Sequence, residues 1–123
     1  MSESTTAAYP KRVAILGGSR IPFARSMGAY MGISNKELMT TTLKSIVEKF
    51  NLQGQKVDDV SLGAVMKHSS DWNMARECVL GCGLAPETPA YDIQQACGTS
   101  LEATILIANK IALGQIQCGI AGG

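Results

Sequence analysis

The sequence predicts an α/β domain built on a mostly parallel sheet. Four short apolar runs have the length and composition of buried strands, at 12–16, 60–66, 90–94 and 118–121. Three segments with helical features separate most of these runs, at 34–52, 73–81 and 99–113. Strands that alternate with helices are typical of βαβ units, in which the strands run parallel.

The composition limits the class of protein. The chain has 123 residues, which is enough for one domain with one core. Its net charge is +1, so the charge balance does not indicate a nucleic-acid partner. No apolar run approaches the ~18 residues of a membrane span. Residues 1–11 are expected to form a flexible tail, with no secretory signal and no arginine-rich presequence.

The four cysteines indicate a reducing compartment. They are Cys78, Cys82, Cys97 and Cys118, and they show neither C-x-x-C spacing nor a dense disulfide framework. We therefore expect reduced thiols in a cytoplasmic protein. Cys78 and Cys82 are four residues apart, but zinc needs further ligands and His68 is the only histidine, so no metal site is expected.

The first half of the chain offers structural signals. The strand at 12–16 is expected to be buried, and the Gly17-Gly18 pair that ends it is not a dinucleotide fingerprint, because no G-x-G-x-x-G opens a helix here. A long loop follows over 19–33. Ser34-Asn35-Lys36-Glu37 is a capping box, so a helix is expected to begin there. One helical turn is expected at 57–59.

The predicted strand at 90–94 is unusually polar. Asp92 and Gln94 share one of its faces, which does not suit a central parallel strand. We interpret it as an edge strand that meets a partner.

Cys97 is the candidate catalytic residue. It lies in a tight turn before a helix that is apolar nearly all round, over 101–113, and such a helix is expected to be buried. The N-terminus of a helix carries unpaired N–H groups and about half a positive charge, which stabilise a thiolate and favour nucleophilic chemistry. Taken alone, a cysteine among small residues is more often a buried hydrophobe. Thr99-Ser100-Leu101-Glu102 also fits a capping box, which would leave Cys97 two residues outside the helix.

Four motifs together resemble the thiolase family. Gln95-Ala96-Cys97-Gly98-Thr99-Ser100-Leu101 is similar to the nucleophile turn of that family. Arg20–Arg25 is similar to the opening motif of the family, and Asn73–Glu77 to the segment before its second helix. Gly119–Gly123 is similar to the end of its fourth strand. The motifs occur in family order over Val13–Gly123, and they are most similar to degradative 3-ketoacyl-CoA thiolases, including the β-subunits of fatty-acid oxidation complexes.

The resemblance implies a role for Cys97. The cysteine would attack a thioester and become acylated while coenzyme A leaves, and a second coenzyme A thiol would cleave the acyl-enzyme. In reverse, an acetyl-CoA carbanion would attack the acyl group and form a carbon–carbon bond. The backbone N–H of Cys97 would donate to the acyl oxyanion, and Gly98 would leave room for the thioester. The family also places the helix start nearer to Cys97. No residue is assigned to coenzyme A, and no permanently bound cofactor is implied.

Other polar residues have structural interpretations. His68 is expected to be exposed in a polar loop, and Asp58-Asp59 to be a turn or helix-start pair. Cys118 is interpreted as a core residue. The Arg20–Arg25 segment is a structural loop, and Asn73–Arg76 has either a structural role or a contact with a partner subunit near the site.

The resemblance also bears on the whole protein. Residues 12–123 would form the first, βαβαβαβ half of the thiolase fold, truncated at its fourth strand and inactive alone. The other catalytic groups of the family, two histidines and an acid/base cysteine, belong to its second half. A homodimer or tetramer is implied, with acyl-CoA and coenzyme A as substrates in fatty-acid β-oxidation. The alternatives are an acetoacetyl-CoA-forming acetyltransferase, a ketoacyl synthase-like condensing enzyme and a non-catalytic dimerising module.

Overall fold

The computed structural model describes residues 8–123, and its elements follow the predicted alternation of strands and helices. In chain order they are α1 (Asn35–Lys49), β1 (Asp59–Gly63), η2 (Ser69–Asp71), α2 (Met74–Cys82), β2 (Ala90–Ile93), η3 (Ala96–Gly98), α3 (Thr99–Ala112) and β3 (Gly119–Ala121). Most of the predicted flexible tail, 1–11, lies outside the described residues. Its last four residues, 8–11, are described and are all exposed.

The sheet is parallel and β1 is its central strand. The strand order is β2-β1-β3, and both neighbours run parallel to β1. Every residue of β1 is buried, whereas β2 and β3 are only partly buried. The predicted α/β class with a mostly parallel sheet is therefore confirmed, and so is the edge position of the strand that contains Asp92.

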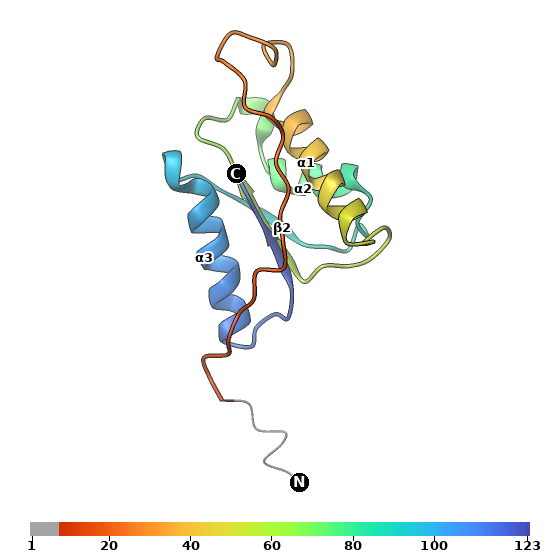
Figure 1. Cartoon of the computed structure of the whole chain (residues 1–123), viewed down its shortest axis with the longest axis vertical. Helices are drawn as coiled ribbons and strands as arrows, with labels where there is room; N and C mark the ends of the chain where they lie inside the picture. The colour runs from red at the N-terminus through yellow and green to blue at the C-terminus, as the bar shows by residue number, and fades with distance from the viewer. Residues whose placement is uncertain (1–7) are drawn as a thin grey trace.

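Helices cover both faces of the sheet. Figure 1 shows α1 and α2 on one side of the strands and α3 on the other. One core cluster joins α1, α2 and β1, and its buried members are Leu43, Val47, Val57, Val60, Leu62, Met74, Ala75, Cys78, Val79, Cys82 and Leu84. The α3 side contributes fewer buried apolar residues, Ala103 and Ile107. The stronger packing thus lies on the α1–α2 side.

The predicted capping box at the start of α1 is confirmed. Ser34 Oγ accepts from Glu37 N–H at 3.1 Å, and Ser34 N–H donates to Glu37 Oε2 at 3.0 Å. The hydrogen bond from the Ser34 backbone lowers the pKa of Glu37, and the Ser34 hydroxyl adds to the effect. The helix at 73–81 is also confirmed, one residue further along as α2.

The predicted buried strand at 12–16 is wrong. This segment pairs with no strand of the sheet, and Ile15 and Leu16 are 84% and 79% exposed. The centre of the sheet is closed to it, because both edges of β1 pair with β2 and β3, and the segment does not join the outer edge of either of these strands. The segment instead runs across the molecule in extended form (Figure 1), and Lys11 N–H donates to Ala112 O at 2.8 Å.

The region around Asp58 and Asp59 also differs from prediction. The single helical turn expected at 57–59 is not formed, because Asp59 begins β1. Asp59 Oδ2 accepts from Lys110 Nζ at 2.5 Å, which raises the pKa of that lysine against the opposing effect of burial. Asp58 Oδ2 accepts from the N–H groups of Gln117 and Cys118 at 2.8 and 3.2 Å. The two carboxylates therefore fix the end of α3 and the loop to β3.

Helix α3 is buried on one face only, which corrects the prediction of a helix buried all round. Thr99, Ala103 and Ile107 face the sheet, whereas Leu101 and Leu113 are 67% and 61% exposed. A flat sheet can cover only one side of a helix, and no other described element covers the opposite side of α3. Cys118 was also predicted to be a core residue, and it is exposed just before β3.

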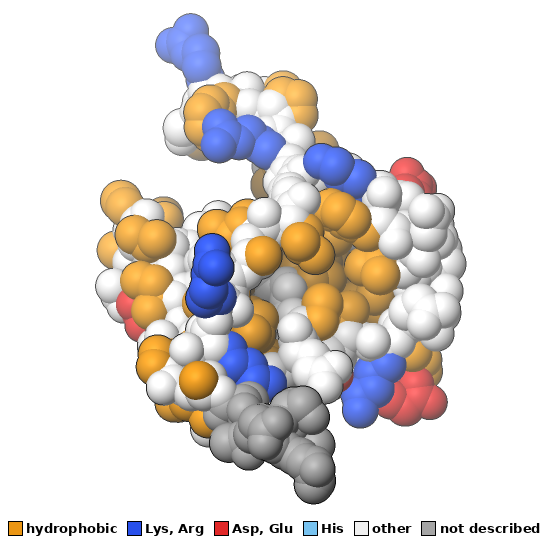
Figure 2. Space-filling view, turned by 60° about the horizontal axis from the view of Figure 1, so that its bottom comes forward, with side chains coloured by type: hydrophobic (Ala, Val, Ile, Leu, Met, Phe, Trp, Pro, Cys, Tyr) orange, Lys and Arg blue, Asp and Glu red, His pale blue; other side chains and the backbone are white. Residues whose placement is uncertain are grey.

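Apolar side chains are consequently prominent on the surface. Figure 2 shows hydrophobic side chains, in orange, clustered on the surface of the face turned to the reader. The large exposed ones include Ile15, Phe23, Met27, Trp72 and Leu101. Monomeric soluble proteins rarely expose large contiguous apolar patches, so we expect the 123-residue chain by itself to associate.

The same substitution on two faces of α3 tests this arrangement. Ile107 is 5% exposed and Ile105 is 43% exposed. Because an unpaired buried charge costs several kcal/mol, Ile107→Asp should abolish the thermal unfolding transition of the 123-residue chain in circular dichroism. Ile105→Asp should keep the transition and reduce self-association in sedimentation experiments. Equal loss of the transition in both variants would show that the Ile105 face is also buried.

Candidate functional site

The candidate nucleophile lies at the carboxyl edge of the sheet. Strand β2 ends at Ile93, two glutamines follow, and the short helix η3 carries Cys97 directly before α3. Cys97 is exposed. α3 begins at Thr99 with Gly98 as its N-cap residue, so Cys97 lies two residues before the first residue of the helix. The α-helix therefore starts at Thr99 and not nearer to Cys97 as the resemblance implied, and the short helix η3 joins the cysteine to it.

The connections of the sheet make this edge a natural binding position. The crossover from β1 to β2 runs through α2 on one face, and the crossover from β2 to β3 runs through α3 on the other (Figure 1). The carboxyl ends of β1 and β2 therefore feed helices on opposite faces. In open α/β sheets, ligands bind outside the carboxyl ends of the strands at such switch points.

The turn that carries Cys97 contains a strained residue. Ala96 has a φ of 45°, in the left-handed region that residues other than glycine rarely adopt. Such a conformation costs on the order of 1–3 kcal/mol and persists only where neighbouring contacts hold it. Gly98 N–H donates to Gln95 O at 2.9 Å, and Thr99 N–H donates to Ala96 O. These bonds close the turn around Cys97.

The side chain of Thr99 adds two further bonds to this turn. Its hydroxyl donates to Ala96 O at 2.8 Å and accepts from Gln95 N–H at 2.8 Å. Thr99 is 2% exposed. The capping box predicted from Thr99 to Glu102 is not formed, because Gly98 occupies the N-cap position and has no side chain to bond. Sequence reasoning assigned Thr99 to the helix, and nothing in the local pattern indicated that its hydroxyl turns back.

Glycines let the strand ends approach Thr99 closely. A Cβ atom at Gly63, the last residue of β1, would lie 2.5 Å from the Thr99 methyl group and would also collide with the carbonyl oxygen of Ile93. A Cβ atom at Gly123 would lie 2.9 Å from the same methyl group. The methyl group of Thr99 is thus enclosed where the carboxyl ends of the strands meet.

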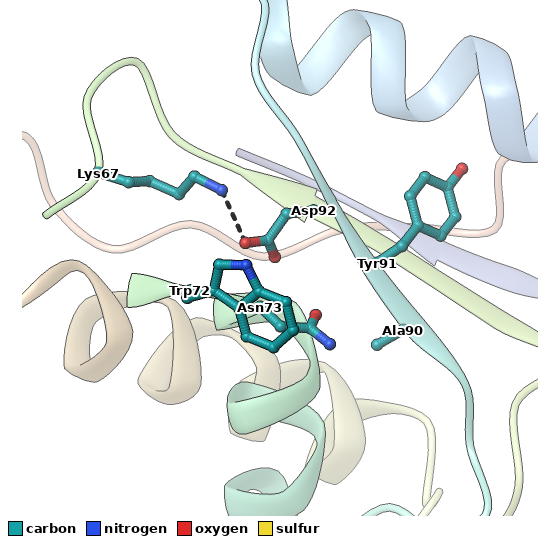
Figure 3. Close-up of a pocket in the computed structure, with 6 residues that line it drawn as sticks. All are labelled: Lys67, Trp72, Asn73, Ala90, Tyr91 and Asp92. Carbon is teal, nitrogen blue, oxygen red and sulfur yellow. Dashed lines mark hydrogen bonds and ion pairs between the residues drawn. The ribbon is translucent and has the colours of Figure 1, made fainter. Parts of the chain in front are cut away.

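Asp92 holds a second helix N-terminus near the site. Asn73, the N-cap residue of α2, is left-handed at φ 50° and makes no side-chain cap. Asp92 supplies the cap from β2, because its carboxylate accepts from the N–H groups of Met74 and Ala75 at 2.9 and 2.7 Å. Lys67 Nζ donates to the same carboxylate at 2.7 Å (Figure 3). The polar face of β2 is explained by these contacts within the chain, and no partner is needed for it.

A shallow depression lies beside this cluster at the free edge of β2. It has a volume of about 300 Å³ and is lined by Lys67, Trp72, Asn73, Ala90, Tyr91 and Asp92. In Figure 3, Asp92 points toward Lys67 over the start of α2, whereas Tyr91 points to the other side of the strand. Trp72 is 84% exposed. Cys97 does not line the depression, so the two features are distinct.

The histidine and the two cysteines of α2 show no arrangement that indicates catalysis or metal binding. His68 is exposed, as predicted, and its Nδ1 accepts from Ser70 N–H at 3.1 Å. Burial raises the pKa of the Cys78 and Cys82 thiols. Within residues 8–123, no three His, Cys, Asp or Glu side chains gather closely enough to hold a metal ion. No helix of this described part combines the length and apolar character that a membrane crossing requires.

Comparison with known proteins decides the family. A family model described as "Thiolase, N-terminal domain" matches residues 13–123. The chain belongs to the thiolase family. The resemblance carried by the four sequence motifs is thereby confirmed.

Individual thiolases and a solved structure agree with this assignment. The chain is 38% identical to a 3-ketoacyl-CoA thiolase of Photorhabdus laumondii over 91% of its own length, and 36% identical to one of Shewanella amazonensis over 98%. It spans 26% and 28% of the length of these two relatives. The crystal structure of the Bacillus anthracis acetyl-CoA acetyltransferase matches 85% of the chain with a TM-score of 0.71 at 25% identity, and the match covers 25% of that structure. The thiolase fold is therefore shown.

Alkylation rates test whether the turn activates Cys97. Iodoacetamide should modify Cys97 faster than the other three cysteines at neutral pH, because only this thiol is both exposed and directly before a long helix. Cys118 is a matched control, since it is exposed without such a helix. Peptide mass spectrometry over a time course measures each rate. Equal rates for Cys97 and Cys118 would contradict the activation.

Removing one charge tests the Asp92 cluster. Asp92→Asn keeps the size of the side chain but weakens its bonds to Lys67 and to the start of α2, so the free energy of unfolding should fall by about 1–3 kcal/mol. Urea denaturation of the natural protein measures the change. Glu87→Gln, at an exposed position, is the control and should change stability by less than about 0.5 kcal/mol. Equal effects of the two substitutions would show that the cluster contributes nothing.

Proposed function

We propose that the protein carrying this chain is a thiolase-type acyltransferase, a 3-ketoacyl-CoA thiolase that works through an acyl-Cys97 thioester. The observation that carries the proposal is the exposed position of Cys97 in a strained turn directly before α3, within a chain of the thiolase family. The names of the relatives at 36–38% identity support the choice of 3-ketoacyl-CoA as substrate.

The proposed thiolysis proceeds in two steps, and the first breaks a carbon–carbon bond; attack of Cys97 on a thioester with loss of coenzyme A forms the acyl-enzyme in the synthetic direction. The Cys97 thiolate attacks the 3-keto carbon of a 3-ketoacyl-CoA, the bond between C2 and C3 breaks, and the carbanion of acetyl-CoA leaves and takes up a proton. The thiol of a second coenzyme A then loses its proton and attacks the acyl-Cys97 thioester. This releases an acyl-CoA shortened by two carbons and regenerates the thiolate. The groups that move these protons belong, by family resemblance, to the second half of the fold.

This chain supplies electrostatic support for both steps. Each attack places negative charge on the carbonyl oxygen of the acyl group. The N–H of Cys97 donates to that oxygen in the proposal, and the N-terminal end of α3 adds partial positive charge. Gly98 keeps the approach to the sulfur free of a side chain.

The proposal includes association of the protein into a homodimer or a larger homo-oligomer. Strand β2 is an edge strand of the described sheet, and exposed apolar groups lie near it, among them Met66 and Trp72 at 79% and 84% exposure. Pairing of two such edges across a two-fold axis would satisfy unpaired backbone groups and cover these side chains. The family resemblance implies this mode of association.

The remaining parts of the proposal rest on the family alone. The protein would act in fatty-acid β-oxidation in the cytoplasm, with acyl-CoA and coenzyme A as substrates and no permanently bound cofactor. An acetoacetyl-CoA-forming acetyltransferase is the second candidate, because the solved structure that matches the fold carries the name acetyl-CoA acetyltransferase. Acyl chain-length preference in the thiolysis assay distinguishes the two.

Substitution of the nucleophile tests the proposed function. In the natural protein, Cys97→Ser should lower kcat for thiolysis of a 3-ketoacyl-CoA at least about 10³-fold, because a neutral hydroxyl cannot replace a thiolate. Cys118→Ser, at another exposed cysteine, is the control and should keep full activity. A natural protein with no thiolysis activity, or a Cys97→Ser variant that keeps it, would contradict the proposal.

A further inference from the structure

We propose that Thr99 is a positioning residue that sets the direction of the Cys97 N–H group. The inference rests on the proposed function, in which this N–H stabilises the oxyanion. It concerns a side chain that does not itself touch the substrate.

One peptide unit, between Ala96 and Cys97, links Thr99 to the proposed oxyanion donor. The carbonyl of Ala96 and the N–H of Cys97 belong to the same planar, trans peptide group, so the two point in opposite directions. Any interaction that fixes the carbonyl also fixes the N–H. Ala96 O accepts from Thr99 twice, from its hydroxyl at 2.8 Å and from its backbone N–H. Thr99 therefore holds one end of the plane that carries the proposed oxyanion donor.

The second bond of the hydroxyl restrains the other side of Ala96. Gln95 N–H donates to Thr99 Oγ1 at 2.8 Å, so one oxygen atom bridges the backbone before and after the strained residue. The φ of 45° at Ala96 is unfavourable for alanine, and the peptide plane is expected to rotate if these bonds are removed. Removal would also leave Gln95 N–H without this acceptor, which adds to the tendency to rearrange.

The methyl group of Thr99 fixes the position from which the hydroxyl acts. It lies where only glycines fit, against Gly63 at the end of β1 and Gly123, two residues after β3. The side chain is 2% exposed, so it has no room to change rotamer. The sheet thus sets the place of Thr99, and Thr99 sets the orientation of the peptide plane before Cys97.

The test compares thiolysis, which needs the oxyanion donor, with alkylation, which needs only the sulfur of Cys97. Thr99→Val keeps the methyl group and the volume but removes the hydroxyl. In the natural protein we expect kcat for thiolysis to fall about 10–100-fold, which is less than complete loss of an oxyanion donor, while KM changes little. Alkylation of Cys97 by iodoacetamide forms no oxyanion, so its rate should stay within about twofold. Thr99→Ser restores the hydroxyl and should restore most of the kcat.

A second pair of variants covers the case in which Thr99→Val does not fold. Thr99→Ser and Thr99→Ala both lack the methyl group and differ only in the hydroxyl, so kcat should be about 10–100-fold lower in the alanine variant. A hydroxyl-free variant with kcat within about twofold of its hydroxyl-bearing partner would overturn the proposal. Equal loss of kcat and alkylation rate would also overturn it, because that result indicates a merely structural role.

These outcomes are distinct from a failure of the proposed function. An active enzyme that depends on Cys97 but tolerates loss of the Thr99 hydroxyl refutes only the positioning role. Activity that survives Cys97→Ser refutes the proposed function, and the role of Thr99 fails with it.

Discussion

The parallel pairing of β1 on both of its edges is the constraint on which the rest of the structure depends. Because β2 and β3 flank the same strand, the chain must cross from one edge of the sheet to the other between them. Right-handed crossovers in opposite directions place their helices on opposite faces, which puts α2 on one side and α3 on the other (Figure 1). The start of α3 and the turn before it then lie at the carboxyl edge, next to the ends of the strands.

The turn is held by a few bonds that act against local preference. Ala96 adopts a conformation that alanine disfavours, and the surrounding bonds come from Gln95, which precedes η3, from η3 itself and from the first residue of α3. Asp92, on β2 and three residues before Gln95, likewise acts through backbone N–H groups, because its carboxylate binds the start of α2 to the strand. A strained residue directly before Cys97 and a half-buried ion pair at Asp92 thus occur on the segment that leads to α3, whereas the core of α1, α2 and β1 is apolar.

Most structural features that depend on residues close together in the sequence could be predicted from it. Features that depend on contacts between distant residues could not. The capping box of Ser34 and Glu37 spans four residues, and it is present as predicted. The polarity of Asp92 correctly indicated an edge strand, but its partners lie 17 to 25 residues away, so their identity could not be predicted. The run at 12–16 has the composition of a strand, yet it joins neither outer edge of the sheet, which its composition does not indicate. Ile105 looks as apolar as Ile107, and only the placement of the sheet distinguishes them. Cys97 was found through a motif. The bonds of Thr99 are an exception, because they span only three and four residues and were missed since the same residue also fits a capping box.

Direct detection of the covalent intermediate tests the central claim, that this turn presents Cys97 as the nucleophile. The natural protein is incubated with acetyl-CoA, quenched in acid and digested, and the peptides are sequenced by mass spectrometry. We expect a single added acetyl group on Cys97, which is lost when free coenzyme A is added before the quench. An acetyl group on a different cysteine, or no adduct in a protein that still catalyses thiolysis, would contradict it.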